Sequence, residues 1–88
     1  MTVSSSTTTI NLPVLKRNTS GEAVRFLQQI LICYGYMTSD YFDSKFNQVT
    51  EDAVKAFQYN HGLLVDGVVG NNTWRALGNA CSIYRNNK

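Results

Sequence analysis

An internal repeat, too short to make two separate domains, constrains this chain more than any other feature. The pattern Ala-Val-x-x-Leu-Gln at 23–28 returns as Ala-Val-x-x-Phe-Gln at 53–58. A second pattern, Asp-x-x-Phe-Asn-x-x-Thr-x-x-Ala at 43–53, returns as Asp-x-x-Val-Gly-x-x-Thr-x-x-Ala at 66–76. The segment around 48–58 therefore closes the first unit and opens the second. Because one such unit cannot bury its apolar face alone, the overlap predicts a single shared core.

Apolar residues recur at helical spacing in three segments, so we expect helices over about 21–34, about 48–60 and from about 71 onward. Gly35 and Gly62 follow the first two, where a left-handed residue commonly ends a helix. The residues expected to face inward are Val24, Leu27, Ile30, Leu31 and Tyr34, then Val49, Ala53, Val54 and Phe57, then Trp74, Leu77, Cys81 and Tyr84. The sequence thus predicts an all-α fold, a compact three-helix bundle built from two overlapping helix-loop-helix repeats.

The repeated loops carry turn chemistry. Asp43 and Asp66 stand where a carboxylate can accept backbone N–H groups within a turn. Phe46 and Val69 are expected to enter the core. We expect the residues just before the next helices to adopt positive φ and the threonines in their first turns to satisfy free N–H groups. These residues are Asn47 and Gly70, and Thr50 and Thr73, with Asn47 or Thr50 as the cap of the second helix.

The part of the chain before the first helix divides in two. Residues 1–11 are polar and rich in Ser and Thr, which predicts a flexible, disordered tail. The run 12–15 is apolar and contains a proline, which favours an extended segment packed on a domain spanning 12–85. Thr19 followed by Glu22 matches a capping box at the start of the first helix.

Composition narrows the class of partner. The net charge is +2 and charged residues make up only 16% of the chain. The polar surface is therefore expected to consist largely of neutral residues, of which the chain has nine Asn, seven Ser and eight Thr. Such neutral hydrogen-bonding groups suit sugars and peptides, whereas the scattered Lys and Arg argue against nucleic acid. No apolar run is long enough to span a membrane, and the amino-terminal residues do not form a signal-peptide pattern.

The residues that usually hold metals or cofactors are scarce. Cys33 and Cys81 are expected to be small buried thiols, with a Cys33–Cys81 disulfide as the alternative. His61 is the single histidine, so no metal site of ordinary ligand spacing is expected, and no cofactor is expected either. His61 precedes Gly62 at a helix end, where a histidine is favourable on dipole grounds, and we interpret it as structural.

The motifs together resemble the peptidoglycan-binding domain family, three-helix modules found beside cell-wall amidases, peptidases and lysozymes. The resemblance covers roughly residues 12–78 and rests on Asn-Thr-Ser-Gly-Glu-Ala-Val-x-x-Leu-Gln at 18–28, Gly-Tyr at 35–36, Asp-x-x-Phe at 43–46, Thr-x-x-Ala-Val-x-x-Phe-Gln at 50–58 and His-Gly-Leu-x-Val-Asp-Gly-x-Val-Gly-x-x-Thr-Trp-x-x-Leu at 61–77. The family commonly has glycine at three positions occupied here by Asn18, Ser44 and Asn47. Asn tolerates positive φ better than Ser, so Ser44 departs most from the family's loop.

Candidate ligand-binding residues are those that could stack on a sugar face, pair through an amide or hold a carboxylate. They are Tyr36, Tyr41, Tyr59, Asn71, Asn72 and Arg75. Other conspicuous residues have simpler structural interpretations. Trp74 lies on an inward stripe, and Gln28 and Gln58 recur in the repeat, which favours a shared structural duty over ligand contact.

No set of residues predicts catalysis. Asp43 and Asp66 occupy equivalent turn positions, and Glu51 and Asp52 lie in a first helical turn where negative charge is favourable. The expected function is therefore a non-catalytic module that binds peptidoglycan, through its glycan or its stem peptide, and anchors a cell-wall hydrolase or envelope protein.

The resemblance further implies a place in the cell envelope, periplasm or extracellular space, with a catalytic hydrolase domain as a partner. We expect a monomer that contacts neither nucleic acid nor membrane. The first alternative is a protein-interaction or regulatory module like the helical pro-segments of metalloproteases. A small DNA-binding bundle is a further alternative, against which the sparse basic residues argue.

Overall fold

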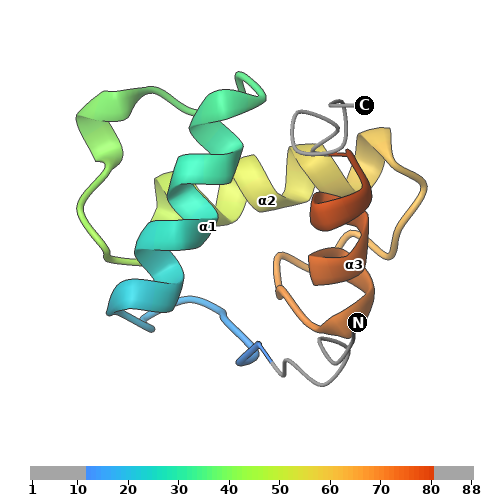
Figure 1. Ribbon diagram of the computed structural model, residues 1–88, viewed down its shortest axis with the longest axis horizontal. Helices are drawn as coiled ribbons and strands as arrows, with labels where there is room; N and C mark the ends of the chain where they lie inside the picture. The colour runs from blue at the N-terminus through green and yellow to red at the C-terminus, as the bar shows by residue number, and fades with distance from the viewer. Residues whose placement is uncertain (1–11, 81–88) are drawn as a thin grey trace, which may run out of the picture.

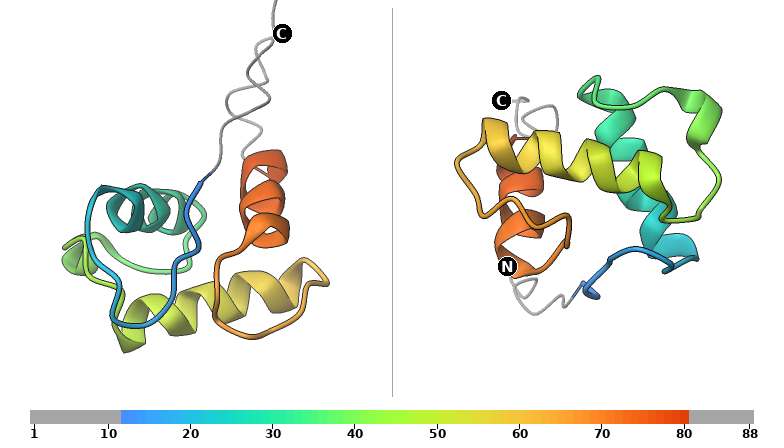
Figure 2. Two further views of the ribbon diagram at one scale, coloured as in Figure 1. Left: turned by 90° about the horizontal axis from the view of Figure 1, so that it is seen from below. Right: turned by 180° about the vertical axis from the view of Figure 1, so that it is seen from behind.

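The computed structural model describes residues 12–80, which form three α-helices and one short 3-10 helix. These are α1 (Glu22–Cys33), the 3-10 helix η1 (Ser39–Tyr41), α2 (Gln48–Asn60) and α3 (Asn71–Ala80). Helix α2 spans the molecule, with α1 and α3 on the same side of it toward opposite ends (Figures 1 and 2). The all-α, three-helix prediction is confirmed. The tail predicted for 1–11 and the domain's last residues, 81–85, lie outside the described part of the chain.

One hydrophobic core joins the two repeat units. It collects the inward stripes of all three helices, two residues from the loop between α1 and α2, one from the loop between α2 and α3 and one from the segment before α1. Its buried members are Leu15, Val24, Leu27, Leu31, Met37, Phe46, Ala53, Val54, Phe57, Val69, Trp74 and Leu77. Phe46 and Val69 are 1% and 0% exposed, which confirms their prediction as core residues. Ile30, Tyr34 and Val49 pack against this core half-buried, while Cys81 and Tyr84 lie outside the described residues.

Two buried glutamines organise the loops, one in each repeat unit. The Gln28 amide donates to Asp43 Oδ1 at 3.1 Å, the Lys45 carbonyl at 3.0 Å and Thr50 Oγ1 at 3.0 Å. Its oxygen accepts the N–H groups of Asp43 and Ser44 at 3.1 and 2.9 Å. A buried amide with this many partners fixes the conformation of the loop, because it satisfies the inward-facing N–H and C=O groups of the loop backbone.

Gln58 repeats this arrangement in the second unit. Its amide donates to Asp66 Oδ1 at 3.0 Å, the Val68 carbonyl at 3.0 Å and Thr73 Oγ1 at 3.1 Å. Its oxygen accepts the N–H groups of Asp66 and Gly67. The expected structural duty of both glutamines is confirmed. The two aspartates also accept N–H groups within their turns, as predicted, from Lys45 and Val68.

The structure corrects several details of the helix starts. The expected capping box is absent, because the Thr19 hydroxyl pairs with the backbone of Lys16 and Gly21 occupies the N-cap of α1 without a side-chain bond. Asn47 does cap α2, accepting from the N–H groups of Val49 and Thr50.

Two threonine and two backbone predictions were also wrong. The hydroxyl oxygens of Thr50 and Thr73 accept hydrogen bonds from the amides of Gln28 and Gln58 instead of from free helix N–H groups. Asn47 has a φ of −110°, and Gly70 does not adopt a positive φ either. An Asn cap needs extended backbone so that its side chain can reach forward, which explains the negative φ.

Left-handed backbone occurs one position after each loop aspartate. Ser44 has φ 67° and Gly67, its counterpart in the second unit, has φ 73°. The first loop therefore keeps the geometry of the second although a serine replaces the glycine, held by the bond from Ser44 N–H to Gln28. Asn18, which also replaces a glycine of the family pattern, has φ 74°.

The segment preceding α1 binds both loops through its backbone. Leu15 and Val69 exchange N–H···O bonds of 3.1 and 2.8 Å, which confirms an extended segment packed on the domain. Farther along, Asn18 donates to the Phe46 carbonyl and the Phe46 N–H donates to Thr19, both at 2.9 Å. The indole of Trp74 donates to the Pro13 carbonyl at 2.8 Å, so α3 also holds this segment.

The surface brings one further correction. Cys33 is exposed at the end of α1, so its prediction as a buried thiol was wrong; Cys81, its candidate disulfide partner, lies outside the described residues. His61 is exposed and stacks on Phe57 with ring centroids 4.1 Å apart, which fits its structural interpretation. None of the helices within residues 12–80 is long and apolar enough to cross a membrane.

Candidate functional site

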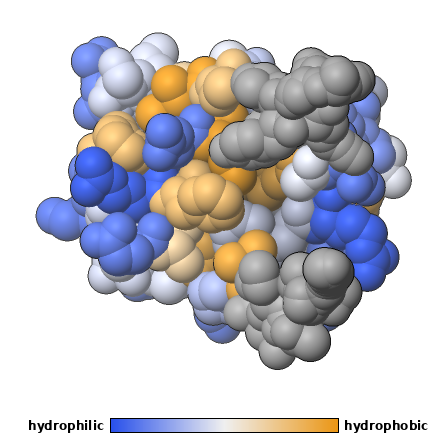
Figure 3. All heavy atoms as spheres, in the orientation of Figure 1, coloured by the Kyte–Doolittle hydropathy of each residue, from blue (hydrophilic) through white to orange (hydrophobic). Residues whose placement is uncertain are grey.

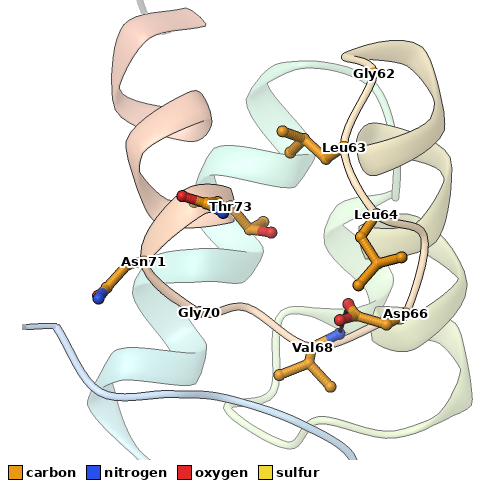
Figure 4. Close-up of a pocket in the computed structure, with 9 residues that line it drawn as sticks. Gly62, Leu63, Leu64, Asp66, Val68, Gly70, Asn71 and Thr73 are labelled. Atoms are coloured by element: carbon orange, nitrogen blue, oxygen red, sulfur yellow. Dashed lines mark hydrogen bonds between the residues drawn. The ribbon is translucent and has the colours of Figure 1, made fainter.

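A pocket of about 520 Å³ lies between the loop after α2 and the first turn of α3. Its lining is Gly62, Leu63, Leu64, Asp66, Val68, Gly70, Asn71, Asn72 and Thr73. We call it the second-unit pocket. Figure 4 shows the Leu63 side chain pointing from the loop toward α3, whereas the Asn71 side chain points away from the loop. Three of the pocket's lining residues, Asp66, Val68 and Thr73, accept hydrogen bonds from the Gln58 amide, which fixes this part of the lining.

The second-unit pocket combines apolar side chains with amide, hydroxyl and carboxylate groups. Asp66 is its charged lining residue, and Oδ1 of this carboxylate accepts from Gln58 and from the Val68 N–H. Oδ2 takes no hydrogen bond from any residue within 12–80, and Asp66 is exposed. Leu64 is 77% exposed beside it. The pocket therefore offers an apolar face, hydrogen-bonding groups and one negative charge without a cation, which disfavours an anionic ligand.

A pocket of about 340 Å³ lies in the first unit, between the 36–41 segment and α2. It is lined by Tyr36, Met37, Thr38, Tyr41, Val49, Asp52, Ala53 and Ala56. We call it the first-unit pocket. The Tyr36 ring meets Phe57 edge-on at 5.8 Å, and its hydroxyl accepts from the Asn60 amide at 3.0 Å, so this ring is fixed. Tyr41 is 42% exposed and supplies a second aromatic wall.

The six candidate residues from the sequence are divided among two pockets and the exposed surfaces of two helices. Tyr36 and Tyr41 line the first-unit pocket, and Asn71 and Asn72 line the second-unit pocket. Tyr59, 77% exposed on α2, and Arg75, exposed on α3, line neither pocket. The structure thus places four of the six at pockets but does not gather them into one site.

Sequence reasoning missed most of the apolar and carboxylate lining. In the second-unit pocket it missed Leu63, Leu64, Asp66 and Val68, and in the first-unit pocket Met37, Val49, Asp52 and Ala56. The repeat itself was the available signal, because the residues that follow each helix-ending glycine line a pocket in both units. Asp66 was interpreted as a turn residue, and it performs that duty while also lining the pocket.

The carboxylate of Asp43, in the loop before α2, has a lowered pKa. The backbone N–H of Lys45 and, next, the Gln28 amide hold the pKa of Asp43 below its ordinary value of 3.8. Both donors favour the charged form of the carboxyl group.

Within residues 12–80 no group of three His, Cys, Asp or Glu side chains is placed to hold a metal ion.

Comparison with known proteins identifies the family to which this chain belongs. Residues 20–77 match the family model described as "Putative peptidoglycan binding domain". Since this match takes in well over half of the sequence, the chain belongs to the peptidoglycan-binding domain family, and the resemblance seen in its motifs is confirmed.

Individual relatives agree with this assignment. The chain is 41% identical over 65 residues to the N-acetylmuramoyl-L-alanine amidase CwlL of Bacillus licheniformis, covering 73% of this chain and 18% of that protein. It is also 41% identical over 66 residues to an uncharacterized protein in the bpoA1 3′ region of Kitasatospora aureofaciens, covering 74% and 55%. The chain therefore spans about a fifth and about half of the lengths of these two relatives.

Solved structures show the same fold. The SleB N-terminal domain superposes with a TM-score of 0.75 at 37% identity, covering 81% of this chain and 96% of that one. A peptidoglycan-binding protein from Clostridioides difficile, in complex with glutamine hydroxamate, gives 0.72 at 37% identity, covering 76% and 41%. The Burkholderia AP3 phage endolysin gives 0.72 at 37% identity, covering 77% and 26%.

Proposed function

We propose that this chain is a non-catalytic module that binds bacterial peptidoglycan at the second-unit pocket and so holds a protein against the cell wall. The family match supports the ligand, and the pocket between Leu63 and Asn72 supports the position. The relatives named as an amidase and an endolysin support a role beside a wall-degrading catalytic domain. The cell envelope or the extracellular space is the corresponding location.

The observation that carries the position is the lining of the second-unit pocket. Leu63 and Leu64 provide apolar surface, Asn72 provides an amide with both donor and acceptor, and Asp66 provides an acceptor with one oxygen free of bonds from residues 12–80. A stem-peptide carboxylate would meet Asp66 without a compensating cation, so the neutral glycan fits this lining better. Binding to one short fragment should be weak, and attachment to a polymer compensates through effective concentration.

Retention on purified, insoluble cell-wall sacculi tests the proposal. The natural chain should sediment with the sacculi, and Asn72→Ala should weaken binding about three- to tenfold, the range expected for one or two lost hydrogen bonds. Asn79→Ala is the matched control, because Asn79 is exposed on the same helix and lines neither pocket. A folded natural chain that stays in the supernatant would overturn the function. Equal retention of Asn72→Ala and the natural chain would overturn the pocket.

A further inference from the structure

The two pockets correspond in part, because each is lined by residues that follow a helix-ending glycine and by a residue of the next helix. Each lies beside the two residues that follow a helix-ending glycine, Tyr36 and Met37 in the first unit and Leu63 and Leu64 in the second. On its other side, the second-unit pocket is bounded by the first turn of α3, and the first-unit pocket by α2 from Val49 to Ala56. The repeat aligns Val49 with Asn72 at that wall, because Thr50 and Thr73 hold the same place in the pattern.

The duplication therefore reaches the surface at three lining positions, whereas Tyr41, Asp52, Ala53 and Ala56 line the first-unit pocket alone. From this correspondence and from the lining residues, we propose that the first-unit pocket is a second saccharide-binding site, one that takes an uncharged N-acetylated sugar ring of the glycan strand. This proposal rests on the proposed function, and it assigns the domain two separate sites for the same polymer.

The chemistry of the first-unit pocket differs from that of its counterpart in a way that favours a sugar ring. Two tyrosines line it, and a flat aromatic face packs well on the C–H surface of a pyranose ring. Tyr36 is held by Phe57 and Asn60, so its ring is already in place before a ligand arrives. A fixed ring loses little conformational freedom on binding, which favours affinity in a shallow site.

The opposite wall of the first-unit pocket is helix α2. Ala53 and Ala56 present small surfaces that leave room for a ring, and Asp52 stands among them as the charged lining residue. Asp52 Oδ1 accepts from the Gln48 amide at 2.7 Å, which orients the carboxylate. A carboxylate accepts hydrogen bonds from sugar hydroxyls and N-acetyl N–H groups but repels the carboxylates of a stem peptide. The saccharide is thus the better occupant.

The two pockets lie apart in the fold. The 36–41 segment and the 62–70 loop sit toward opposite ends of α2 in all three ribbon views (Figures 1 and 2). One sugar ring therefore cannot fill both pockets, and the two sites should bind independently. Two weak sites on one rigid domain raise the avidity for a polymer without raising the affinity for a short fragment.

Apolar side chains also gather near the middle of the face shown in Figure 3, between more polar edges. This feature does not compete with the first-unit pocket as a saccharide site. Phe26 stacks on Trp74 with ring centroids 5.9 Å apart, and this contact links α1 with α3. Nothing among the described residues indicates a ligand for it.

Backbone amide shift mapping of the full 88-residue chain tests the second site. The probes are chitotriose, a neutral oligomer of N-acetylglucosamine, and a free stem tripeptide. Chitotriose should shift two clusters of amides, one around 62–73 and one around 36–41 and 49–56. Tyr41→Ala should abolish only the second cluster and should lower retention on sacculi about three- to tenfold. Tyr41→Phe keeps the ring and should behave like the natural chain.

Tyr59→Ala is the matched control, since Tyr59 is exposed on α2 and lines neither pocket. Chitotriose shifts confined to 62–73 would overturn the second site and leave the proposed function intact. Shifts around 36–41 produced by the tripeptide but not by chitotriose would overturn the saccharide assignment. The proposed function itself fails only if the natural chain is not retained by sacculi, a separate measurement.

Discussion

The side-chain oxygen of Gln28 accepts the N–H of Ser44 at 2.9 Å and thereby holds a serine in left-handed backbone at φ 67°. The same relationship joins Gln58 to Gly67 at 2.9 Å, where glycine adopts φ 73° without strain. The two units thus place the same left-handed backbone conformation on a serine in one loop and on a glycine in the other. This difference and the hydrogen bonds around it give three predictions about stability, and the segment before α1 gives a fourth.

Removing the Gln28 amide should be severely destabilising. In Gln28→Leu, the Asp43 and Ser44 N–H groups, the Lys45 carbonyl and the Thr50 hydroxyl lose a partner inside the fold. Unfolding in urea should show a loss of about 2–4 kcal/mol, the usual cost of several unsatisfied buried groups. Gln29→Leu, at the adjacent exposed position, should change the unfolding free energy by less than about 0.5 kcal/mol. Equal effects of the two substitutions would contradict the central role of Gln28.

Relieving the backbone strain at Ser44 should stabilise the protein. Ser44→Gly removes a Cβ from left-handed backbone, and we expect a gain of about 0.5–1 kcal/mol in unfolding free energy. The reciprocal change, Gly67→Ala, should destabilise, because the new Cβ would combine positive φ with a distance of 3.0 Å to Glu51 Cγ. Denaturant midpoints of the two variants should move in opposite directions, and a shift in the same direction would contradict the equivalence of the loops.

Asp43 should contribute an acid-sensitive part of the stability. Its pKa is lowered in the folded state, so its stabilising effect is complete above the ordinary value of 3.8 and is lost as the pH falls through the lower, folded-state pKa. Asp43→Asn keeps an acceptor oxygen but removes the titration. The unfolding free energy of this variant should therefore fall less steeply than that of the natural chain below about pH 4.

The control for the acid titration is Asp40→Asn in η1, which removes the same charge from an exposed carboxylate nearby. It should leave the steep acid limb of the natural chain in place. An acid limb that Asp43→Asn does not flatten would show that other carboxylates dominate the pH dependence.

Among the apolar side chains of the segment before α1, that of Leu15 should contribute most to stability. Leu15 is 2% exposed in the core, and its neighbour Val14 is 61% exposed. Leu15→Ala should cost about 2–5 kcal/mol, whereas Val14→Ala should cost less than about 0.5 kcal/mol. The fluorescence of Trp74, the single tryptophan of the chain, reports unfolding of both variants. A small effect of Leu15→Ala would mean that this segment is held by its backbone bonds alone.

The fold was predictable because several independent signals in the sequence agree. The periodicity located all three helices, and recurrence alone was enough to identify Gln28 and Gln58 as structural. The errors came from local choices between competing partners. Thr19 turned back to Lys16 instead of capping α1, and Cys33, at the last turn of α1, faces solvent. A linear pattern does not say which of two nearby groups a hydroxyl will reach.

The pockets were less predictable than the fold, for a physical reason. A pocket depends on how two segments stand relative to each other, and periodicity reports only which face of each segment is buried. Residue chemistry selected Tyr41 and Asn72 as ligand-binding candidates, and both line pockets, but it selected Tyr59 equally strongly, although Tyr59 is 77% exposed on α2 and lines neither pocket. Comparing the residues after Gly35 with those after Gly62 was the additional step that the sequence allowed.

Helix α2 belongs to both repeat units, and this sharing governs how the domain can come apart. Its residue Thr50 completes the first glutamine network, while Gln58, two turns later, begins the second. A cut between the units would have to pass through a continuous helix, so neither half can detach and persist as a partly folded intermediate. Unfolding should therefore be all-or-none, with the slowest-exchanging amides of both halves opening at one common free energy.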